Sequence, residues 1–173
     1  MQLVVLGLNH KTVPVDIREQ FAISPDSARS GLIHLEEQEG IEEAVVLSTC
    51  NRTEIYAVLK DETAKETLYD FFLALSGNSE AKDEYFFYFE GESCIRHLFE
   101  VVSGLDSMVI GESQILNQIK TAYTMALEEK ATRTILNTLF HRAIRTGKRV
   151  RPETQMAYSA GSVSYAAGNL AEK

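Results

Sequence analysis

The sequence of 173 residues has little cysteine, and this scarcity excludes two classes of small stabilised domain. Cys50 and Cys94 are too few for a disulfide framework or a cysteine-rich zinc site, and neither belongs to a Cys-x-x-Cys pair. The four histidines are scattered and never form the His-Glu-x-x-His spacing of zinc hydrolases. The sequence therefore predicts no metal site.

A long apolar segment is also missing. No run approaches the roughly 20 residues that cross a bilayer. The opening residues, MQLVVLG, lack the basic region of a signal peptide. With 45% hydrophobic and 24% charged residues, the composition is typical of a folded globular protein rather than a disordered one. We therefore expect a cytoplasmic protein of one compact domain, alone or with an appendage, that does not contact a membrane.

Positive charge is in the minority. The chain has 17 Lys and Arg residues against 25 Asp and Glu, which excludes a uniformly basic nucleic-acid-binding surface. One segment, residues 131–151, nevertheless holds six basic residues and no acidic one: Arg133, Arg142, Arg145, Lys148, Arg149 and Arg151. Because the whole chain carries −8, the remainder carries −14. A solvated face is the usual explanation of such a segment, and contact with phosphates is the alternative.

Recognisable nucleotide-binding loops are absent as well. No Gly-x-Gly-x-x-Gly follows an expected strand, and the segment Gly147–Arg149 lacks the upstream glycine and the Ser or Thr of a P-loop.

The order of the expected elements predicts the fold class. Short apolar, β-branched or aromatic runs predict strands at 2–9, 43–47, 53–59 and 85–89, with helices after the first and third. Three further helices are expected at about 91–103, 113–130 and 133–149. This order predicts an α+β fold, a ferredoxin-like split βαβ sandwich followed by a C-terminal group of α-helices.

Cys50 is the first candidate for chemistry, because it lies in a short polar connection between two expected strands. A thiolate is a far better nucleophile than a thiol, and a cation such as Arg52 nearby favours the thiolate. The alternative is that free cysteines are usually small buried residues. That interpretation is favoured for Cys94, which shares a helix face with Leu98.

Arg52 and His97 each admit two interpretations. Arg52 has the fork geometry that binds a substrate carboxylate, yet its spacing favours a pair with Glu54. His97 is the best partner for Cys50 in proton transfer, but a histidine at the border of an apolar helix face is more often structural. Sequence spacing does not decide whether His97 and Cys50 meet.

Gln114 and Gln118 are four residues apart and therefore lie on one helix face. Their amides are suited to binding both polar ends of an amino acid. An ordinary solvated face is the alternative.

Several segments of the chain resemble the glutamyl-tRNA reductase family. The resemblance is carried by GLNHKTVPV at 7–15, LSTCNRTEIY at 47–56, RHLF at 96–99 and SGLDSMVIGE at 103–112. It continues through QIL at 114–116 and GKR at 147–149 to SVSYAA at 162–167, and so covers nearly the whole chain.

The resemblance implies an oxidoreductase that converts the glutamyl ester of tRNA-Glu into glutamate-1-semialdehyde with NADPH, for 5-aminolevulinate and tetrapyrrole (porphyrin) biosynthesis. It implies that Cys50 is the catalytic nucleophile, which forms a thioester intermediate, and that His97 is a second catalytic residue. It also implies a set of substrate-binding residues: Thr49, Asn51, Arg52, Ser107, Glu112, Ser113, Gln114 and Gln118.

The resemblance further implies a domain organisation. Residues 1–155 match the N-terminal catalytic domain and 156–173 the start of a linking spinal helix, whereas the NADPH-binding and dimerisation domains are expected to be absent from this chain. We therefore expect acyl transfer without reduction. Expected partners are glutamyl-tRNA, glutamate-1-semialdehyde aminotransferase and, in the full-length enzyme, a second copy. Two alternatives are a non-catalytic RNA-binding module and a thiol hydrolase or redox sensor built on Cys50.

Overall fold

The computed structural model describes residues 1–79, 81–108 and 114–153. The expected start of the spinal helix at 156–173, together with Glu112 and Ser113, lies outside these residues. No helix in the described part of the chain combines the length and apolar character needed to cross a bilayer.

Four strands form one antiparallel sheet. They are β1 (Gln2–Asn9), β2 (Ile41–Ser48), β3 (Arg52–Leu59) and β4 (Phe87–Glu90), in the spatial order β2-β3-β1-β4. Strand β3 lies between β1 and β2, and β1 lies between β3 and β4, so each helical connection crosses one intervening strand. This is the split βαβ arrangement, and it confirms the predicted α+β, ferredoxin-like class.

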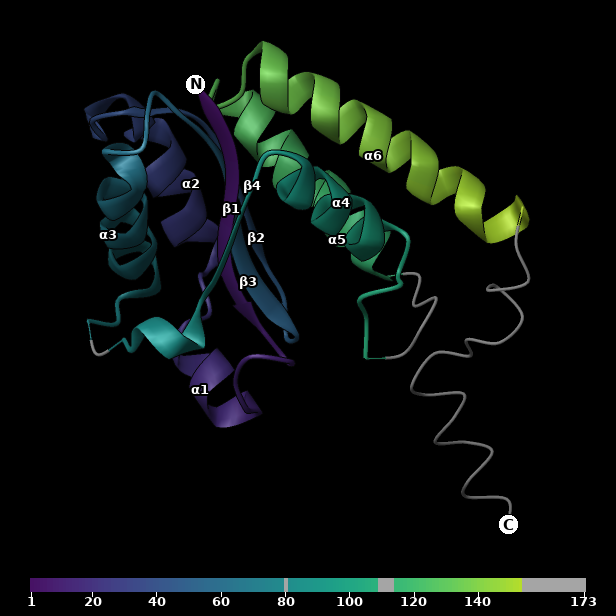
Figure 1. The fold of residues 1–173 in the computed structure, drawn as a ribbon, viewed down its shortest axis with the longest axis horizontal. Helices are drawn as coiled ribbons and strands as arrows, with labels where there is room; N and C mark the ends of the chain where they lie inside the picture. The colour runs from purple at the N-terminus through teal and green to yellow at the C-terminus, as the bar shows by residue number, and fades with distance from the viewer. Residues whose placement is uncertain (80, 109–113, 154–173) are drawn as a thin grey trace.

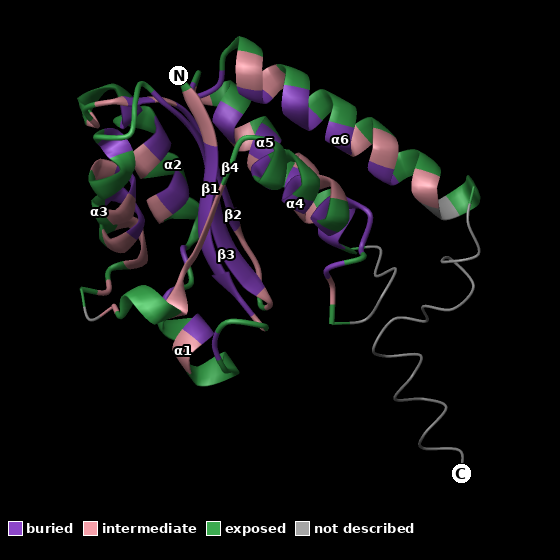
Figure 2. Ribbon diagram, in the orientation of Figure 1, coloured by how far each residue is buried: buried purple, intermediate pink, exposed green. Residues whose placement is uncertain are grey.

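Two helical layers cover the sheet. Helices α2 (Pro25–Ile33) and α3 (Ala64–Ser76) pack on one face, and α4 (Glu92–Val102), α5 (Gln114–Glu128) and α6 (Thr134–Glu153) pack on the other (Figure 1). The short helix α1 (Val15–Gln20) follows β1 at one end of the sheet. Because the central strand is covered from both sides, all eight residues of β3 are buried (Figure 2).

The burial of β3 extends to its charged residues. Side chains alternate between the two faces of a strand, so Arg52, Glu54 and Tyr56 all point toward the layer of α4, α5 and α6. On that side the Tyr56 ring packs edge-on against Phe140 of α6, with ring centroids 5.4 Å apart. The same face therefore holds both the core packing and a pair of buried charges.

A strand carboxylate anchors the start of α6. The buried side chain of Glu43 in β2 accepts hydrogen bonds from the backbone N–H groups of Arg133, Ile135 and Leu136, at 2.7, 3.2 and 2.9 Å. The first N–H groups of a helix have no partner within the helix and carry partial positive charge, so a carboxylate there stabilises the helix. Glu43 thus ties α6 to the sheet across about ninety residues of sequence.

Replacing Glu43 by Ala is expected to lower the free energy of unfolding by about 2 kcal/mol, because three buried N–H groups lose their acceptor. Glu42→Ala is the matched control, since the Glu42 side chain forms an ion pair with the exposed Arg133 at 3.4 Å. That control is expected to change stability by less than about 0.5 kcal/mol. Urea unfolding of both variants measures the difference, and equal effects would contradict the anchoring role of Glu43.

Candidate functional site

Cys50 lies in the turn that joins β2 to β3. The hydroxyl oxygen of Thr49 accepts hydrogen bonds from the N–H groups of Asn51 and Arg52, both at 3.2 Å, and the N–H of Thr49 donates to the carbonyl of Arg52 at 2.8 Å. These bonds hold the turn in one conformation, and Cys50 at its tip is exposed. The predicted polar connection between two strands is thereby confirmed.

The segment after β1 braces this turn. The N–H of His10 donates to the carbonyl of Asn51 at 3.1 Å. The guanidinium of Arg18 in α1 donates from Nε to the carbonyl of Cys50 at 3.3 Å, and from Nη1 to the carbonyl of Val13 at 2.8 Å. Arg18 is only 9% exposed, so its charge lies within the structure beside the cysteine loop. The cation that contacts the Cys50 backbone is therefore Arg18.

Arg52 points away from the turn, into the protein. Its Nη1 donates to Glu54 and to the carboxylate of Asp106, each at 2.9 Å, and its Nη2 donates to the backbone carbonyl of Asp106 at 2.6 Å. The pair with Glu54, which the sequence offered as the alternative to substrate binding, is thus present. Asp106 also forms an ion pair with Lys11, which extends the network toward the surface.

Glu54 is the most enclosed charge of this network, with a side chain that is 0% exposed. Besides Arg52, it accepts from the Tyr56 hydroxyl at 2.7 Å and faces Nε2 of His97 at 3.0 Å. Burial alone would raise the pKa of Glu54, but the hydrogen bond from His97 and the charge of Arg52 outweigh burial and hold the pKa below its ordinary value. An ionised carboxylate only accepts hydrogen bonds, so Nε2 of His97 is the donor.

The neighbouring strand must leave room for Glu54. Gly7 of β1 stands opposite Glu54 in the register, and a Cβ at Gly7 would lie 2.8 Å from Cγ of Glu54 and 2.7 Å from the carbonyl oxygen of Thr53. Any side chain here would displace the buried carboxylate or the backbone of β3. The close approach of the two strands therefore requires glycine at this position.

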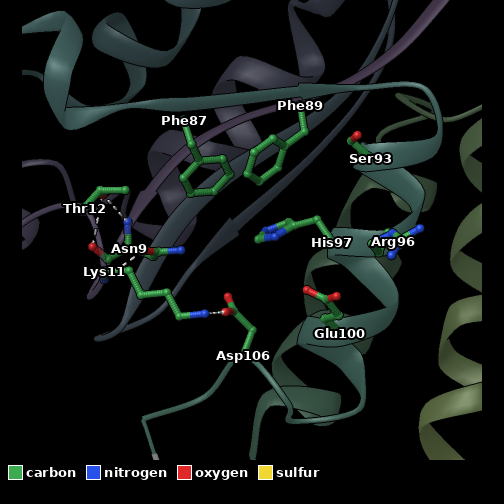
Figure 3. A pocket seen from close by; sticks show the side chains of 10 residues that line it. All are labelled: Asn9, Lys11, Thr12, Phe87, Phe89, Ser93, Arg96, His97, Glu100 and Asp106. Carbon is green, nitrogen blue, oxygen red and sulfur yellow. Dashed lines mark hydrogen bonds and ion pairs between the residues drawn. The ribbon is translucent and has the colours of Figure 1, made fainter.

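His97 forms part of the wall of a cavity of about 400 Å³ (Figure 3). Its ring lies 5.0 Å from that of Phe87 and 5.3 Å from that of Phe89, measured between centroids. Lys11 and Asp106 line the polar side of the same cavity. With Nε2 committed to Glu54, His97 has Nδ1 left for a ligand, and that atom has no partner among the described residues.

The described contacts of His97 run to Glu54, Tyr56 and the two phenylalanines, and none to Cys50 is found among the described residues. The two residues are linked indirectly, because Arg52 begins the strand directly after the cysteine turn and binds Glu54. Proton transfer between His97 and Cys50 therefore stays a prediction.

The other predicted site residues that the structure describes lie on α5 and in the loop after α4. Gln118 is half-buried and lines a second cavity of about 290 Å³ together with Ser48, the last residue of β2. Gln114 is exposed at the start of α5, and Ser107 is half-buried directly after Asp106. Glu112 and Ser113 are outside the described residues. Within the described part of the chain, no group of three or more His, Cys, Asp or Glu side chains is arranged to hold a metal ion.

Three charged residues of the network were missed by sequence reasoning. Lys11 and Asp106 both stand inside segments that carry the family resemblance, and this was the signal that could have marked them. Arg18 offered no local signal, because its contact with Cys50 joins residues 32 positions apart.

Removing the central carboxylate is expected to be costly. Glu54→Ala leaves the buried Arg52 and His97 without their shared partner, and we expect a loss of about 3–5 kcal/mol in the free energy of unfolding. Tyr56→Phe, which removes one hydrogen bond, is expected to cost about 1–2 kcal/mol and keeps the test available if the first variant does not fold. Glu100→Ala, at an exposed acid of the same cavity, is the control, with a change below about 0.5 kcal/mol in urea unfolding.

Acid is expected to weaken the fold through Glu54 and Asp106. Burial would raise the pKa of Asp106, but its bonds to Lys11 and Arg52 hold that pKa below the ordinary value, as for Glu54. The ion pairs of the Glu54 and Asp106 carboxylates therefore stabilise the fold fully above the pKa of about 4 that these groups have in the unfolded chain. This stabilisation is lost as pH falls through their lower pKa values in the folded protein. In urea unfolding at a series of pH values, the free energy of unfolding of Asp106→Asn is expected to fall less steeply toward low pH than that of the wild-type chain. The same pH dependence in both proteins would contradict the pairing.

Comparison with known proteins identifies the family. Residues 6–154 match the family described as Glutamyl-tRNAGlu reductase, N-terminal domain. The chain is 46% identical to the glutamyl-tRNA reductase of Pelobacter propionicus and 49% identical to that of Geobacter metallireducens, in each case over 100% of this chain and 40% of the relative. A solved structure titled Glutamyl-tRNA Reductase from Methanopyrus kandleri superimposes with a TM-score of 0.78 at 35% identity, covering 98% of this chain and 39% of the other.

The chain thus spans about two fifths of the length of the relatives it matches. Its fold agrees with that part of the solved relative. The chain belongs to the glutamyl-tRNA reductase family and corresponds to its N-terminal domain.

Proposed function

We propose that this chain carries out the acyl-transfer step of glutamyl-tRNA reduction, with Cys50 as the nucleophile. The observation that supports this most directly is the exposed position of Cys50 at the tip of a turn held by Thr49 and Arg18, in a chain of this family. Cys94 contrasts with it, because Cys94 is fully enclosed and burial raises the pKa of its thiol to about 12.

In the proposed step, the Cys50 thiolate attacks the carbonyl carbon of the glutamyl ester on tRNA-Glu. A carbon–sulfur bond forms, the carbon–oxygen bond to the 3′-terminal ribose breaks, and the ribose oxygen takes up a proton. The product is a glutamyl thioester on Cys50. Its carbonyl is a good hydride acceptor, because sulfur donates less electron density to the carbonyl than oxygen does.

His97 is the proposed source of the proton or of carbonyl polarisation. Because Nε2–H of His97 is donated to Glu54, the ring presents Nδ1 for this role, and the donor is the imidazolium form, in which Nδ1 also carries a proton and the Glu54 carboxylate balances the charge. The contacts with Phe87 and Phe89 fix the plane of the ring, so the direction of Nδ1 is set before substrate arrives. Glu54 would act as a positioning residue in this arrangement.

Substrate recognition is proposed for Thr49, Asn51, Arg52, Ser107, Glu112, Ser113, Gln114 and Gln118, of which Glu112 and Ser113 lie outside the described residues. The structure adds a condition for Arg52, since its Nη1 and Nη2 atoms already bind Glu54 and Asp106. A glutamate γ-carboxylate at Arg52 must therefore share the guanidinium with Asp106 or displace it. A glutamine amide in the same place would accept a weaker hydrogen bond from the guanidinium than a carboxylate does, which favours glutamate over glutamine.

The segment after β1 does not have the form of a nucleotide-binding loop. Strand β1 leads into residues 10–14 and a six-residue helix, and the sequence has no glycine-rich loop there to hold a pyrophosphate. We therefore assign no reduction step to the described residues. We propose that reduction to glutamate-1-semialdehyde, NADPH binding, dimerisation and contact with the aminotransferase are properties of the whole enzyme.

Covalent capture tests the proposal. The chain is incubated with tRNA-Glu charged with labelled glutamate and quenched in acid, and we expect protein-bound label that hydroxylamine releases, as it does from a thioester. Cys50→Ser is expected to abolish this label while tRNA binding persists, because a serine hydroxyl is a far weaker nucleophile than a thiolate and forms no thioester.

Cys94→Ala is the matched control and is expected to retain the label. Label that persists in Cys50→Ser, or disappears in Cys94→Ala alone, would contradict the assignment. Binding of tRNA without any label in the wild-type chain would favour the RNA-binding module, and equal reaction with simple esters would favour a general thiol hydrolase.

A further inference from the structure

The outer face of α6 carries positive charge that the fold does not use. Arg142, Arg145 and Lys148 are exposed, and none has an acidic partner among the described residues. By contrast, Arg149 pairs with Glu153 at 2.9 Å and Arg133 pairs with Glu42 at 3.4 Å. The three free charges therefore contribute nothing evident to stability.

These three residues share one side of the helix. At 3.6 residues per turn, they fall within an arc of about 120°, which also contains Arg149. The opposite side is apolar, and Phe140 on that side stacks against Tyr123 with ring centroids 5.3 Å apart. Because this packing fixes the rotation of α6, the basic side faces outward, in agreement with the exposure of Arg142, Arg145 and Lys148.

The packing of Gly147 fixes the position of the basic face along the molecule. A Cβ at Gly147 would lie 2.8 Å from the carbonyl oxygen of Val102 and 3.1 Å from the Leu116 side chain, so α6 sits directly on the end of α4 and the start of α5. Only four residues after Val102, Asp106 binds Arg52 at the base of the cysteine turn. The basic face is thus connected to the turn that carries Cys50 through the end of α4 and the short loop to Asp106.

The distribution of charge on the chain limits where a polyanion could bind, and the outer face of α6 is the basic region. With a net charge of −8, the chain as a whole repels nucleic acid, and the exposed side of neighbouring α4 pairs its Arg96 with Glu92. Residues 142 and 148 are separated by about 9 Å along the helix axis, a length over which one nucleic-acid strand presents more than one phosphate.

We propose that Arg142, Arg145 and Lys148 on the outer face of α6 bind backbone phosphates of the tRNA whose 3′ end delivers the glutamyl ester to Cys50. This inference rests on the proposed function, since it takes its ligand from the reaction assigned to Cys50. The contacts are to phosphates and not to bases, so they position the tRNA without reading its sequence.

The test is the salt dependence of tRNA binding by the full 173-residue chain. Arg142→Ala/Arg145→Ala is compared with Lys60→Ala/Lys82→Ala, which removes two exposed positive charges elsewhere on the surface. Filter binding of unmodified tRNA-Glu transcript between about 50 and 200 mM salt gives the slope of log K against log salt for each protein. We expect the α6 variant to bind about tenfold more weakly and to lose roughly two units of slope, whereas the control keeps the wild-type slope.

Equal slopes of log K against log salt in all three proteins would overturn the assignment. Equal losses of affinity and slope in the two double variants would also overturn it, as would a wild-type chain that does not bind the transcript. Far-ultraviolet circular dichroism of the α6 variant verifies that the helix is intact. Covalent labelling of Cys50 in the wild-type chain is scored separately. Labelling without a slope change refutes the α6 surface alone, and a slope change without labelling refutes the chemistry alone.

Discussion

The carboxylate of Glu54 is the constraint around which this structure is built. A charge on the central strand with no exposed surface is costly unless it is fully paired, and Glu54 is paired by Arg52, Tyr56 and His97. The need to pair the Glu54 carboxylate determines several other features of the structure. Gly7 must lack a side chain, Arg52 must turn inward, and α4 must bring His97 to within 3.0 Å. The loop after α4 then supplies Asp106 as the second acid for Arg52.

This network explains how an exposed cysteine is held on rigid support. Strand alternation sends Arg52 into the protein, while Cys50, two residues earlier, remains in the turn at the surface. Thr49 closes the turn, and Arg18 and His10 brace its backbone from the segment after β1. A functional side chain on a short loop between paired strands combines accessibility with a fixed position. The buried charges have a second consequence. Glu54 binds Nε2 of His97, so Nδ1 is the ring nitrogen that remains available to a ligand in the cavity.

Much of the fold could be predicted from the sequence, because its strands and helices are marked by local patterns. The apolar run of β1, the alternation of elements and the polar turn at Cys50 were sufficient for the ferredoxin-like arrangement. The partners of the charged residues were not predictable in this way. Arg52 meets Asp106 across 54 residues and His97 meets Glu54 across 43, so only the folded chain decides between the alternatives for Arg52 and His97. The same is true of Glu43, whose role at α6 depends on residues 90 positions away. Gln114 and Gln118 share a helix but differ in exposure, which spacing alone does not reveal.

The most direct test of this account is the protonation of the His97 ring. Nitrogen-15 NMR of the chain with labelled histidine, assigned with His97→Gln, reports which ring nitrogen carries hydrogen. We expect a protonated Nε2 that shows a hydrogen bond to Glu54, and we expect its signal to change in Tyr56→Phe, which perturbs the same carboxylate. An unprotonated Nε2 at neutral pH would contradict the account, because Glu54 would then not hold His97 and Nδ1 would not be presented to the cavity.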